Sequence, residues 1–521
     1  MDNKTKAWEQ YQAGVEYKRR IGLYTAVREN ERFYRGEQWN GVNANGLPTP
    51  VFNIIKRIVS YMISTAMSQS VSINYSDDSL ASVDDPELKE KISKGIELLN
   101  KNASYRADKD KLEVLLRQGM LDAAISGDGV FYSYWDPDVK TGQMYTGDIK
   151  TVLCDNTELF VSNVNSRDLQ KQAYVMLSGR DTVENLRIEA EENGASKAEC
   201  ARIVADVPDG ANAGEMFDIE SENEQYATYL IKFSRDENGF VIWEKATQSV
   251  VIKTGKTNMT RYPIAYFSWE NVKGSFIGNS PISALIPNQK YINKAYAMVM
   301  KHMTDTAFSK VVYDKTLIPE WTNEAGQAIA VKGGDVHQAA AIIGVGAMQS
   351  GFLDVINLTM MHTKELMGAT DAALGEVDPD NTSAILALQE SSNIPLESIR
   401  QNLYACVEDI ALNWAQMMLE YYPKERLVPY EENGKSYSQS MPDAQIFKSS
   451  LIRARVDVGA GTKYSQILSV NTLDKLLSGG YIAIEDYLER LPDGIINDKQ
   501  GLIDKIIQDK RMMKEQTVNA G

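Results

Sequence analysis

Apolar residues recur every three or four positions in several stretches of the chain, which is the spacing of one buried helix face. Residues 1–36 have a helical pattern, and a second, more apolar helix is predicted over residues 51–67. Its apolar positions form one stripe: Ile54, Ile55, Ile58, Val59, Met62, Ile63 and Ala66. A polar helix is predicted from Pro86, because proline suits a first helical turn, and another from Asp108 to Ile125.

Short runs that alternate apolar and polar residues predict strands among these helices. Residues 129–149 and 229–245 each read as two strands joined by a turn rich in Asp, Gly, Asn or Pro. Residues 159–177 predict another strand pair before a helix near 182–193. Residues 1 to about 275 therefore mix helices with antiparallel hairpins, which predicts an α+β fold.

From Pro281 the pattern changes to long helices. The first is predicted to have about 27 residues and a length of roughly 40 Å. Its stripe consists of Leu285, Ile292, Tyr296, Val299, Met303 and Ala307. A short β-rich region containing Trp321 follows, and a second helix is predicted from near Gly351. One face of this second helix carries Phe352, Val355, Ile356, Thr359 and Leu366. Two helices with a small β tip form a stalk, and because two helices cannot bury all their apolar surface, neighbouring copies of the chain are its natural partners.

Glycine, proline and small polar residues interrupt the helical pattern over residues 368–393, which predicts a flexible segment between helices. The next helix has one of the most regular stripes in the chain: Leu396, Ile399, Leu403, Cys406, Ile410, Trp414, Met417 and Tyr421. It is expected to stop before Pro423. Strands are predicted at 430–438 and 451–458, and short amphipathic helices after them.

Composition limits the class of protein. The chain has 521 residues, 43% of them hydrophobic, which is typical of a soluble protein with several domains. It contains 55 Lys and Arg against 71 Asp and Glu, a net charge of −16. An acidic chain is a poor candidate for gripping nucleic acid, because that affinity comes from cations that replace counterions on phosphates. The three cysteines form no pair typical of a disulfide framework or metal site, and we find no secretion signal or membrane-spanning run.

Residues 457–465, DVGAGTKYS, resemble a phosphate-binding loop at first sight. That loop requires a lysine directly after its last glycine and then a Ser or Thr that holds magnesium. Here Thr462 separates Gly461 from Lys463, and Tyr464 stands where the hydroxyl ligand belongs. A turn at the end of a strand explains the residues better, so no nucleotide cofactor is expected.

Other chemistry-bearing residues are scattered. The only histidines are His302, His337 and His362, and none share the spacing of metal ligands on a helix. We find no nucleophile motif, so no catalytic residue, metal or other cofactor is predicted. A carboxylate cluster lies in the flexible segment at Glu376, Asp378 and Asp380. Such clusters are most often simply solvated; the alternative is a cation or acid–base site.

The order of elements resembles the portal proteins of tailed bacteriophages. The resemblance covers about 400 residues and depends on order and spacing rather than on one diagnostic motif. It is carried by RFYRGEQWNG, PVFNIIKRIVSYMISTAM with SVSINY, ISGDGVFYSYWDPDVKTG, LFVSNVNSRDLQKQAYVML, GNSPISALIPNQKYINKAYAMVMKHM, and the helix, Gly/Asp-rich break and long helix of residues 352–422.

The resemblance implies a non-enzymatic, portal-like α+β fold with a mixed wing, a long-helix stem, a small β-rich clip and a helical crown. The expected boundaries are wing 1–280, completed by 395–460; stem helices 281–308 and 350–370; clip 309–349; tunnel loop 371–394; and crown 461–521. Twelve subunits would form a ring at one capsid vertex, assembled in the cytoplasm of the host bacterium. Double-stranded DNA would pass through the ring, without sequence-specific binding, during packaging and ejection.

The resemblance also implies partners and contact residues. The expected partners are the terminase large subunit, a head–tail adaptor, the major capsid protein and a scaffold protein; no membrane is involved. DNA-facing tunnel-loop positions would be Asp371, Glu376, Asp378, Asp380, Asn381, Thr382 and Ser383. Partner-docking positions of the clip would be Lys310, Tyr313, Lys315, Trp321, Lys332 and His337. For Trp321, a place in the core of the β tip is the alternative.

The negative net charge of the chain is compatible with this role. An acidic channel wall would repel the phosphates of DNA and so reduce the affinity that would slow its passage. Two other classes remain open at the level of sequence. One is an enzyme of the packaging machinery, an ATPase or nuclease, which needs a nucleotide or metal site. The other is a scaffold or head–tail adaptor without a tunnel, which predicts rings that lack a central channel.

Overall fold

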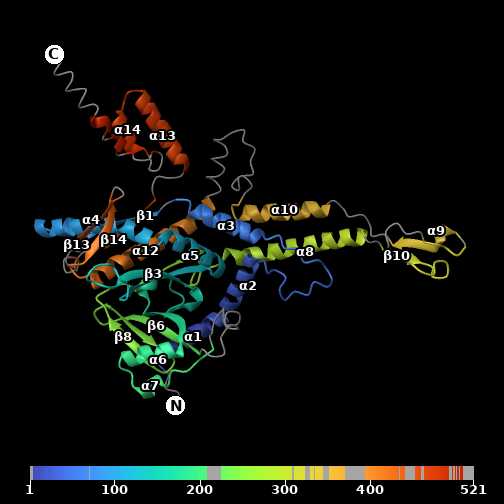
Figure 1. Ribbon diagram of the computed structural model, residues 1–521, viewed down its shortest axis with the longest axis horizontal. Helices are drawn as coiled ribbons and strands as arrows, with labels where there is room; N and C mark the ends of the chain where they lie inside the picture. The colour runs from blue at the N-terminus through green and yellow to red at the C-terminus, as the bar shows by residue number, and fades with distance from the viewer. Residues whose placement is uncertain are drawn as a thin grey trace.

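The fold is described from a computed structural model of the chain (Figure 1). The described residues are 4–69, 71–207, 225–307, 310–322, 329–333, 335–343, 351–369, 394–432, 435–440, 447, 452–458, 463–491, 496, 499, 501–503 and 505–508. A body of helices and sheets carries a two-helix arm that ends in a small β tip, and a C-terminal helical unit lies apart from the body (Figure 1). The mixture of helices with antiparallel sheets confirms the α+β prediction.

The body helices begin and end where local chemistry favours it. They are α1 (Lys6–Arg20), α2 (Leu23–Arg35), α3 (Ile54–Ala66), α4 (Pro86–Lys109), α5 (Leu112–Ser126), α6 (Val183–Glu192), α7 (Lys197–Cys200) and α12 (Glu397–Tyr421), with 3₁₀ turns η1 (Asp78–Ser82), η2 (Asn156–Glu158), η3 (Leu169–Lys171) and η4 (Ile394–Leu396). The helical pattern of residues 1–36 is two helices, because Gly22 takes a left-handed φ of 74° between them. Pro86 starts α4 as predicted, and Asp85 caps it by accepting a hydrogen bond from the Glu87 backbone.

Within the part of the chain that the structure describes, the body strands form four antiparallel sheets. They are β1 (Val71–Asp77), β2 (Asp128–Asp136), β3 (Asp148–Cys154), β4 (Leu159–Val161), β5 (Tyr174–Thr182), β6 (Tyr226–Arg235), β7 (Val241–Ala246), β8 (Val251–Lys256), β9 (Ile264–Ser268), β12 (Leu427–Glu432), β13 (Lys435–Ser440) and β14 (Ile452–Val458). The largest sheet has the order β4-β5-β6-β7-β8, and a second has the order β3-β2-β9. Two-stranded sheets join β12 to β13 and β1 to β14.

The three predicted strand pairs are confirmed as β2–β3, β4–β5 and β6–β7. The single strand predicted at 430–438 is wrong, because Glu432 pairs with Lys435 across the β12–β13 hairpin. The two residues between them are Asn433 and Gly434, the favoured sequence of a two-residue turn. An alternating pattern shows which residues face one side of a sheet, but it does not show where the strand reverses.

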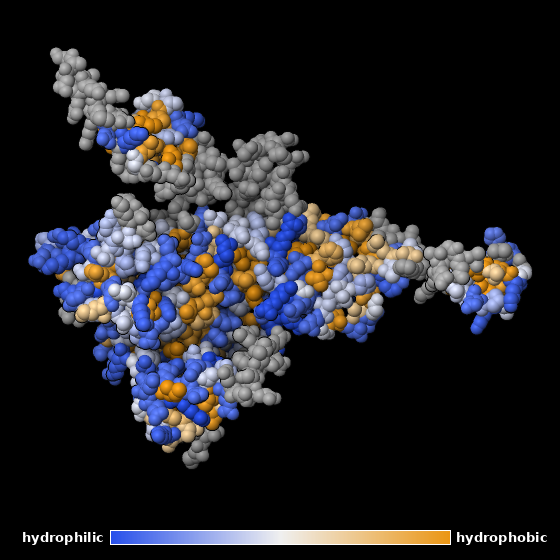
Figure 2. Space-filling model, viewed as in Figure 1, coloured by the Kyte–Doolittle hydropathy of each residue, from blue (hydrophilic) through white to orange (hydrophobic). Residues whose placement is uncertain are grey.

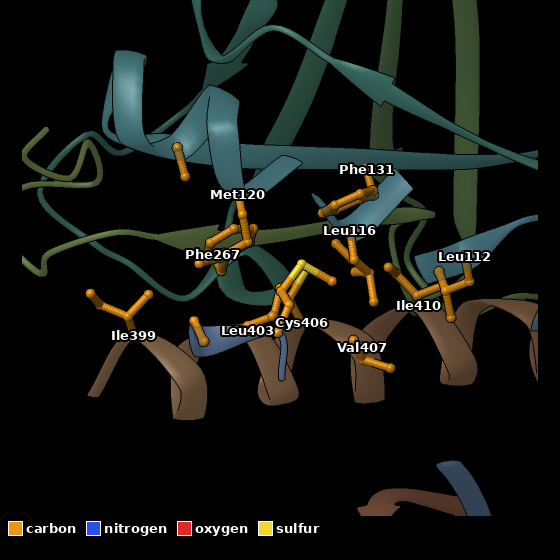
Figure 3. Close-up of a cluster of buried hydrophobic side chains, with 14 of the residues drawn as sticks. Leu112, Leu116, Met120, Phe131, Phe267, Ile399, Leu403, Cys406, Val407 and Ile410 are labelled. Carbon is orange, nitrogen blue, oxygen red and sulfur yellow. The ribbon is translucent and has the colours of Figure 1, made fainter. Parts of the chain in front are cut away.

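The main hydrophobic core lies where α12 crosses the body. The predicted stripe of α12 is buried against α5 and strands β2 and β9 (Figure 3). Leu403, Cys406 and Ile410 point from α12 toward Leu116 and Phe131, and all five side chains are almost fully inaccessible to water (Figure 3). The regular spacing of this helix therefore reflects burial along nearly its whole length.

A buried charge cluster joins the β2–β3 hairpin to the helices. Asp148 accepts hydrogen bonds from Arg106 Nη2 at 3.0 Å and from the Tyr422 hydroxyl at 2.7 Å, and it also pairs with Lys109. The Arg426 guanidinium lies 3.7 Å from the same carboxylate. Burial alone would raise the pKa of Asp148, but Arg106 and the surrounding donors hold that pKa well below its usual range.

The arm and the C-terminal unit complete the chain. The arm consists of α8 (Pro281–Ala307) and α10 (Gly351–Leu366), and its tip of β10 (Lys310–Tyr313), α9 (Val336–Ala339) and β11 (Ala340–Ile343). The C-terminal unit contains α13 (Lys463–Ser478) and α14 (Ile484–Arg490) around its own small apolar core. Within the described residues, the helices lack an apolar stretch of the length and hydropathy needed to span a bilayer.

Candidate functional site: the arm and its tip

The two arm helices pack side by side through a narrow strip of contacts. Asn288 Nδ2 of α8 donates to Thr363 Oγ1 of α10 at 3.1 Å, and the Tyr296 hydroxyl contacts Met360 Sδ at 3.7 Å. Ile356 is the one apolar side chain of α10 that is fully buried there. The helix predicted to begin near Gly351 is confirmed, as is the long helix after Pro281.

The arm leaves much of its apolar surface exposed. Of the predicted α10 stripe, Ile356 is 2% exposed, whereas Phe352 is 54%, Val355 48% and Leu366 75% exposed. The exposure agrees with the expectation that two helices cannot bury all their apolar surface, because α8 covers only the edge of that stripe. Other exposed apolar residues of the two helices are Tyr291, Met298, Met300, Met303, Leu353, Leu358 and Met361. Figure 2 shows these apolar patches along the arm.

The tip brings together two of the predicted docking residues. Tyr313 of β10 stacks on Trp321 with ring centroids 5.4 Å apart, and Trp321 itself is half-buried. Ile318 and Ala339 are buried in the tip, whereas Val312 is exposed. Lys310 begins β10, opposite Ile343 of β11.

The other predicted docking residues are spread over the tip surface. Lys315 and Lys332 are exposed, and the Lys332 backbone N–H donates to the Leu317 carbonyl at 2.8 Å, which joins their two segments. His337 is exposed in α9, whose N-terminus is capped by Asp335. The short helix α9 was not expected in a region predicted to be strand-like.

The seven predicted DNA-facing positions, Asp371, Glu376, Asp378, Asp380, Asn381, Thr382 and Ser383, all lie outside the described residues. The described chain leaves α10 at Ala369 and resumes at Ile394 in η4, immediately before α12. The predicted loop is therefore bounded by the arm on one side and by the main core on the other.

Within the described residues, no group of three or more His, Cys, Asp or Glu side chains is arranged to hold a metal ion. His362 Nδ1 lies 3.2 Å from Glu365 on the surface of α10. At the apparent phosphate loop, β14 ends at Val458 and α13 begins at Lys463, and the four residues between them lie outside the described ranges.

A second buried polar centre of the body, besides the Asp148 cluster, surrounds Lys18. The Lys18 ammonium donates to the carbonyls of Asn156, Thr157 and Leu159 at 2.6–2.9 Å, and burial lowers its pKa to about 7. Asp128 lines the same small cavity, and burial raises its pKa to about 6. The cavity measures about 20 Å³, room for a single water molecule. The centre therefore ties α1 to the body and has no space for a substrate.

Sequence reasoning missed two functional candidates at the base of the arm, the buried amides Gln289 and Asn293. Both lie on the inner face of α8, next to the apolar stripe. The signal in the sequence was two amides four residues apart, next to a stripe that is predicted to be buried. A buried amide needs hydrogen-bond partners, so such a pair indicates a polar contact between elements.

The chain was compared with known families and proteins. A model of the family described as "Phage P22-like portal protein" matches residues 167–458, more than half of the chain. No curated protein matches it. The matched region includes most of the sheets, the whole arm with its tip, α12 and β14. The chain therefore belongs to the phage P22-like portal protein family.

Proposed function

We propose that this protein assembles into a ring, with twelve subunits expected, at one vertex of the capsid. The ring is the channel for packaging and ejection of double-stranded DNA, and it serves first as the docking platform for the terminase and later for the head–tail adaptor. In this proposal the body is the wing, α8 and α10 are the stem, the tip is the clip, residues 371–394 are the tunnel loop and residues 461–521 the crown.

The observation that carries the proposal is the uncovered apolar surface of the arm. An isolated arm with this many exposed Phe, Leu, Val and Met side chains would tend to aggregate in water. A ring of arms removes it, because each α10 can pack against the arm of the neighbouring subunit. Heterologous contacts of this kind close into a ring when the rotation between subunits closes.

Charge distribution supports a channel through which DNA slides. The arm and tip, residues 281–366, contain seven lysines and seven acidic residues, whereas the whole chain carries −16. The acidity therefore belongs mainly to the body and to the 371–394 segment, which contains five acidic residues and no Lys or Arg, whereas residues 461–521 contain nine acidic and eight basic residues. An arm and tip without net charge neither hold phosphates tightly nor depend strongly on salt for their release.

The test is assembly of a variant with charges on α10. We expect Phe352→Asp with Val355→Asp to abolish rings while leaving the subunit folded, because buried carboxylates at the contact would lack partners. The matched control is Met144→Asp, since Met144 is 88% exposed in the body, away from the arm. Mass photometry and electron microscopy would count subunits. A wild-type protein that never forms rings would refute the proposal, and rings without a central channel would favour a tunnel-less adaptor.

A further inference from the structure

Hydrogen bonds at the base of the arm connect α8 to the ends of three body helices. Helix ends carry backbone groups that lack partners within the helix. In this protein, side chains on or beside α8 satisfy such groups on α2, α3 and α5. The direction in which the arm leaves the body is therefore tied to directional bonds as well as to apolar packing.

Gln289 makes the central connection and uses both ends of its amide. Its Oε1 accepts hydrogen bonds from the backbone N–H groups of Ile54 and Ile55, at 3.0 and 3.4 Å, which are the first two residues of α3. Its Nε2 donates to the Phe52 carbonyl at 2.7 Å and to Asn293 Oδ1 at 2.9 Å. The side chain is 1% exposed, so no water replaces these partners.

Asn293 extends the connection to α2. Its Nδ2 donates to Gln38 Oε1 at 2.6 Å, and Gln38 Nε2 donates in turn to the Phe33 carbonyl, in the last turn of α2, at 3.1 Å. Asn293 and Gln38 are both buried. The amide relay, defined here as Gln38, Gln289 and Asn293, thus links the end of α2, the start of α3 and the inner face of α8.

A second set of bonds holds the first turn of α8. The Ser280 hydroxyl donates to the Ala124 carbonyl at 2.5 Å, and Ser283 Oγ donates to Asn30 Oδ1 at 3.0 Å. Asn30 Nδ2 donates to the Ile125 carbonyl at 2.7 Å, at the end of α5. The start of the arm is therefore fixed before the amide relay is reached.

Pro287 lies between these two sets of bonds, inside α8. Proline has no N–H, so the hydrogen bond that would normally reach the Ser283 carbonyl is missing, and prolines are the usual place where helices bend. The first turn is anchored on one side of this weak point and the amide relay on the other. Without the relay, bending at Pro287 would be resisted by apolar contacts, which have no directional preference, and by the ion pair of Lys290 with Glu29 of α2 at 2.7 Å. Both side chains of that pair are about half exposed, so solvent screens it and it contributes little.

We propose that Gln289 and Asn293 are positioning residues that set the angle of the arm to the body and thereby the number of subunits in the ring. The inference rests on the ring proposed above. In a closed ring the rotation between neighbours is about 30° for twelve subunits and about 28° for thirteen. Body contacts and arm contacts must both agree with the same rotation. A change of only a few degrees in the arm angle is therefore enough to favour a different ring.

The test is the distribution of ring sizes. Gln289→Leu and Asn293→Leu break the relay, and class averages from electron microscopy should change from one subunit number to a mixture of at least two. The control is Asn102→Leu in α4, because Asn102 is equally buried and loses a comparable bond, from its Nδ2 to the Pro429 carbonyl at 2.7 Å. The control should lower the thermal midpoint while keeping a single ring size.

The outcomes separate this inference from the proposed function. If relay variants form rings of one size, identical to the wild type, the positioning role is refuted and the ring proposal stands. If the wild type forms no rings, the ring proposal itself fails. If Gln289→Leu does not fold, Asn293→Leu decides, because it leaves the Gln289 cap on α3 in place.

Discussion

The Asp148 cluster offers the sharpest test of what holds the body together. Asp148→Asn keeps the shape of the side chain but removes the negative charge among Arg106, Lys109 and Arg426. Arg106 and Arg426 are almost completely buried. Once Asp148 has lost its charge, the carboxylate that still pairs with Arg106 is Asp110, at 3.7 Å. Leaving a buried charge without its partner costs about 3–5 kcal/mol, so we expect the free energy of unfolding to fall by about that amount.

The matched control lies directly across the hairpin. Asp136 pairs with Asp148 in the register of β2 and β3, but its salt bridge to Lys150, at 2.6 Å, is near the surface. Asp136→Asn should cost no more than about 1 kcal/mol, because solvent screens such pairs. Urea unfolding of unassembled subunits, followed by circular dichroism, would measure both variants at pH 7.

Acidification provides an independent check. The pKa of Asp148 is lower in the folded chain than in the unfolded chain. Its stabilising contribution is therefore complete above about pH 4, the ordinary pKa of an aspartate, and is lost as pH falls further toward the folded value. The difference between wild type and Asp148→Asn should shrink below pH 4. The reasoning would be refuted if Asp148→Asn lowered the free energy of unfolding by less than about 1 kcal/mol at pH 7. It would also be refuted if the difference between the two proteins did not change on acidification.

Three further predictions concern single sites. Burial and the neighbouring acidic residues raise the pKa of Asp122 to about 7. The stabilisation from the protonated carboxyl is therefore complete below about pH 4, the ordinary pKa of an aspartate, and is lost as pH rises through 7. Asp122→Asn should raise the urea midpoint at pH 8 and leave it unchanged at pH 4. Gly119→Ala would place a Cβ 2.4 Å from the Phe131 ring, and calorimetry should show a loss of about 1–3 kcal/mol from overpacking, whereas an unchanged midpoint would mean that the ring moves freely. Lys18→Met leaves three buried carbonyls without their donor, and we expect a loss of about 2–4 kcal/mol in urea unfolding; equal stability would show that water replaces the ammonium.

Much of the secondary structure was predictable because its causes are local. The α12 stripe from Leu403 to Met417 is buried as its spacing indicated. Turn residues placed the β2–β3 and β6–β7 hairpins correctly, since Gly, Asn and Asp near a reversal are favoured by backbone sterics alone. The order of these elements was also enough to indicate the portal family, which the matching family model confirms.

Long-range partners were not predictable. Val71 of β1 pairs with Val458 of β14, nearly 400 residues later, and no local pattern records such a pairing. The same limit applies to α10, where Phe352 and Ile356 belong to one apolar stripe but only Ile356 is covered. Hydrophobic spacing shows which residues form an apolar face, but it does not show which other element packs against that face.

The sequence by itself thus determined most of the helices, the strand pairs β2–β3, β4–β5 and β6–β7, and the two long helices of the arm. It did not determine the β12–β13 hairpin or α9. Only the tertiary structure shows that Gln289 caps α3 and that one side of the arm remains exposed. It also shows that Asp148 pairs with cations from α4 and from the connection between α12 and β12. The physical reason is that propensity and periodicity act within a few residues along the chain. Directional hydrogen bonds, ion pairs and the covering of an apolar face instead depend on groups that only folding brings together.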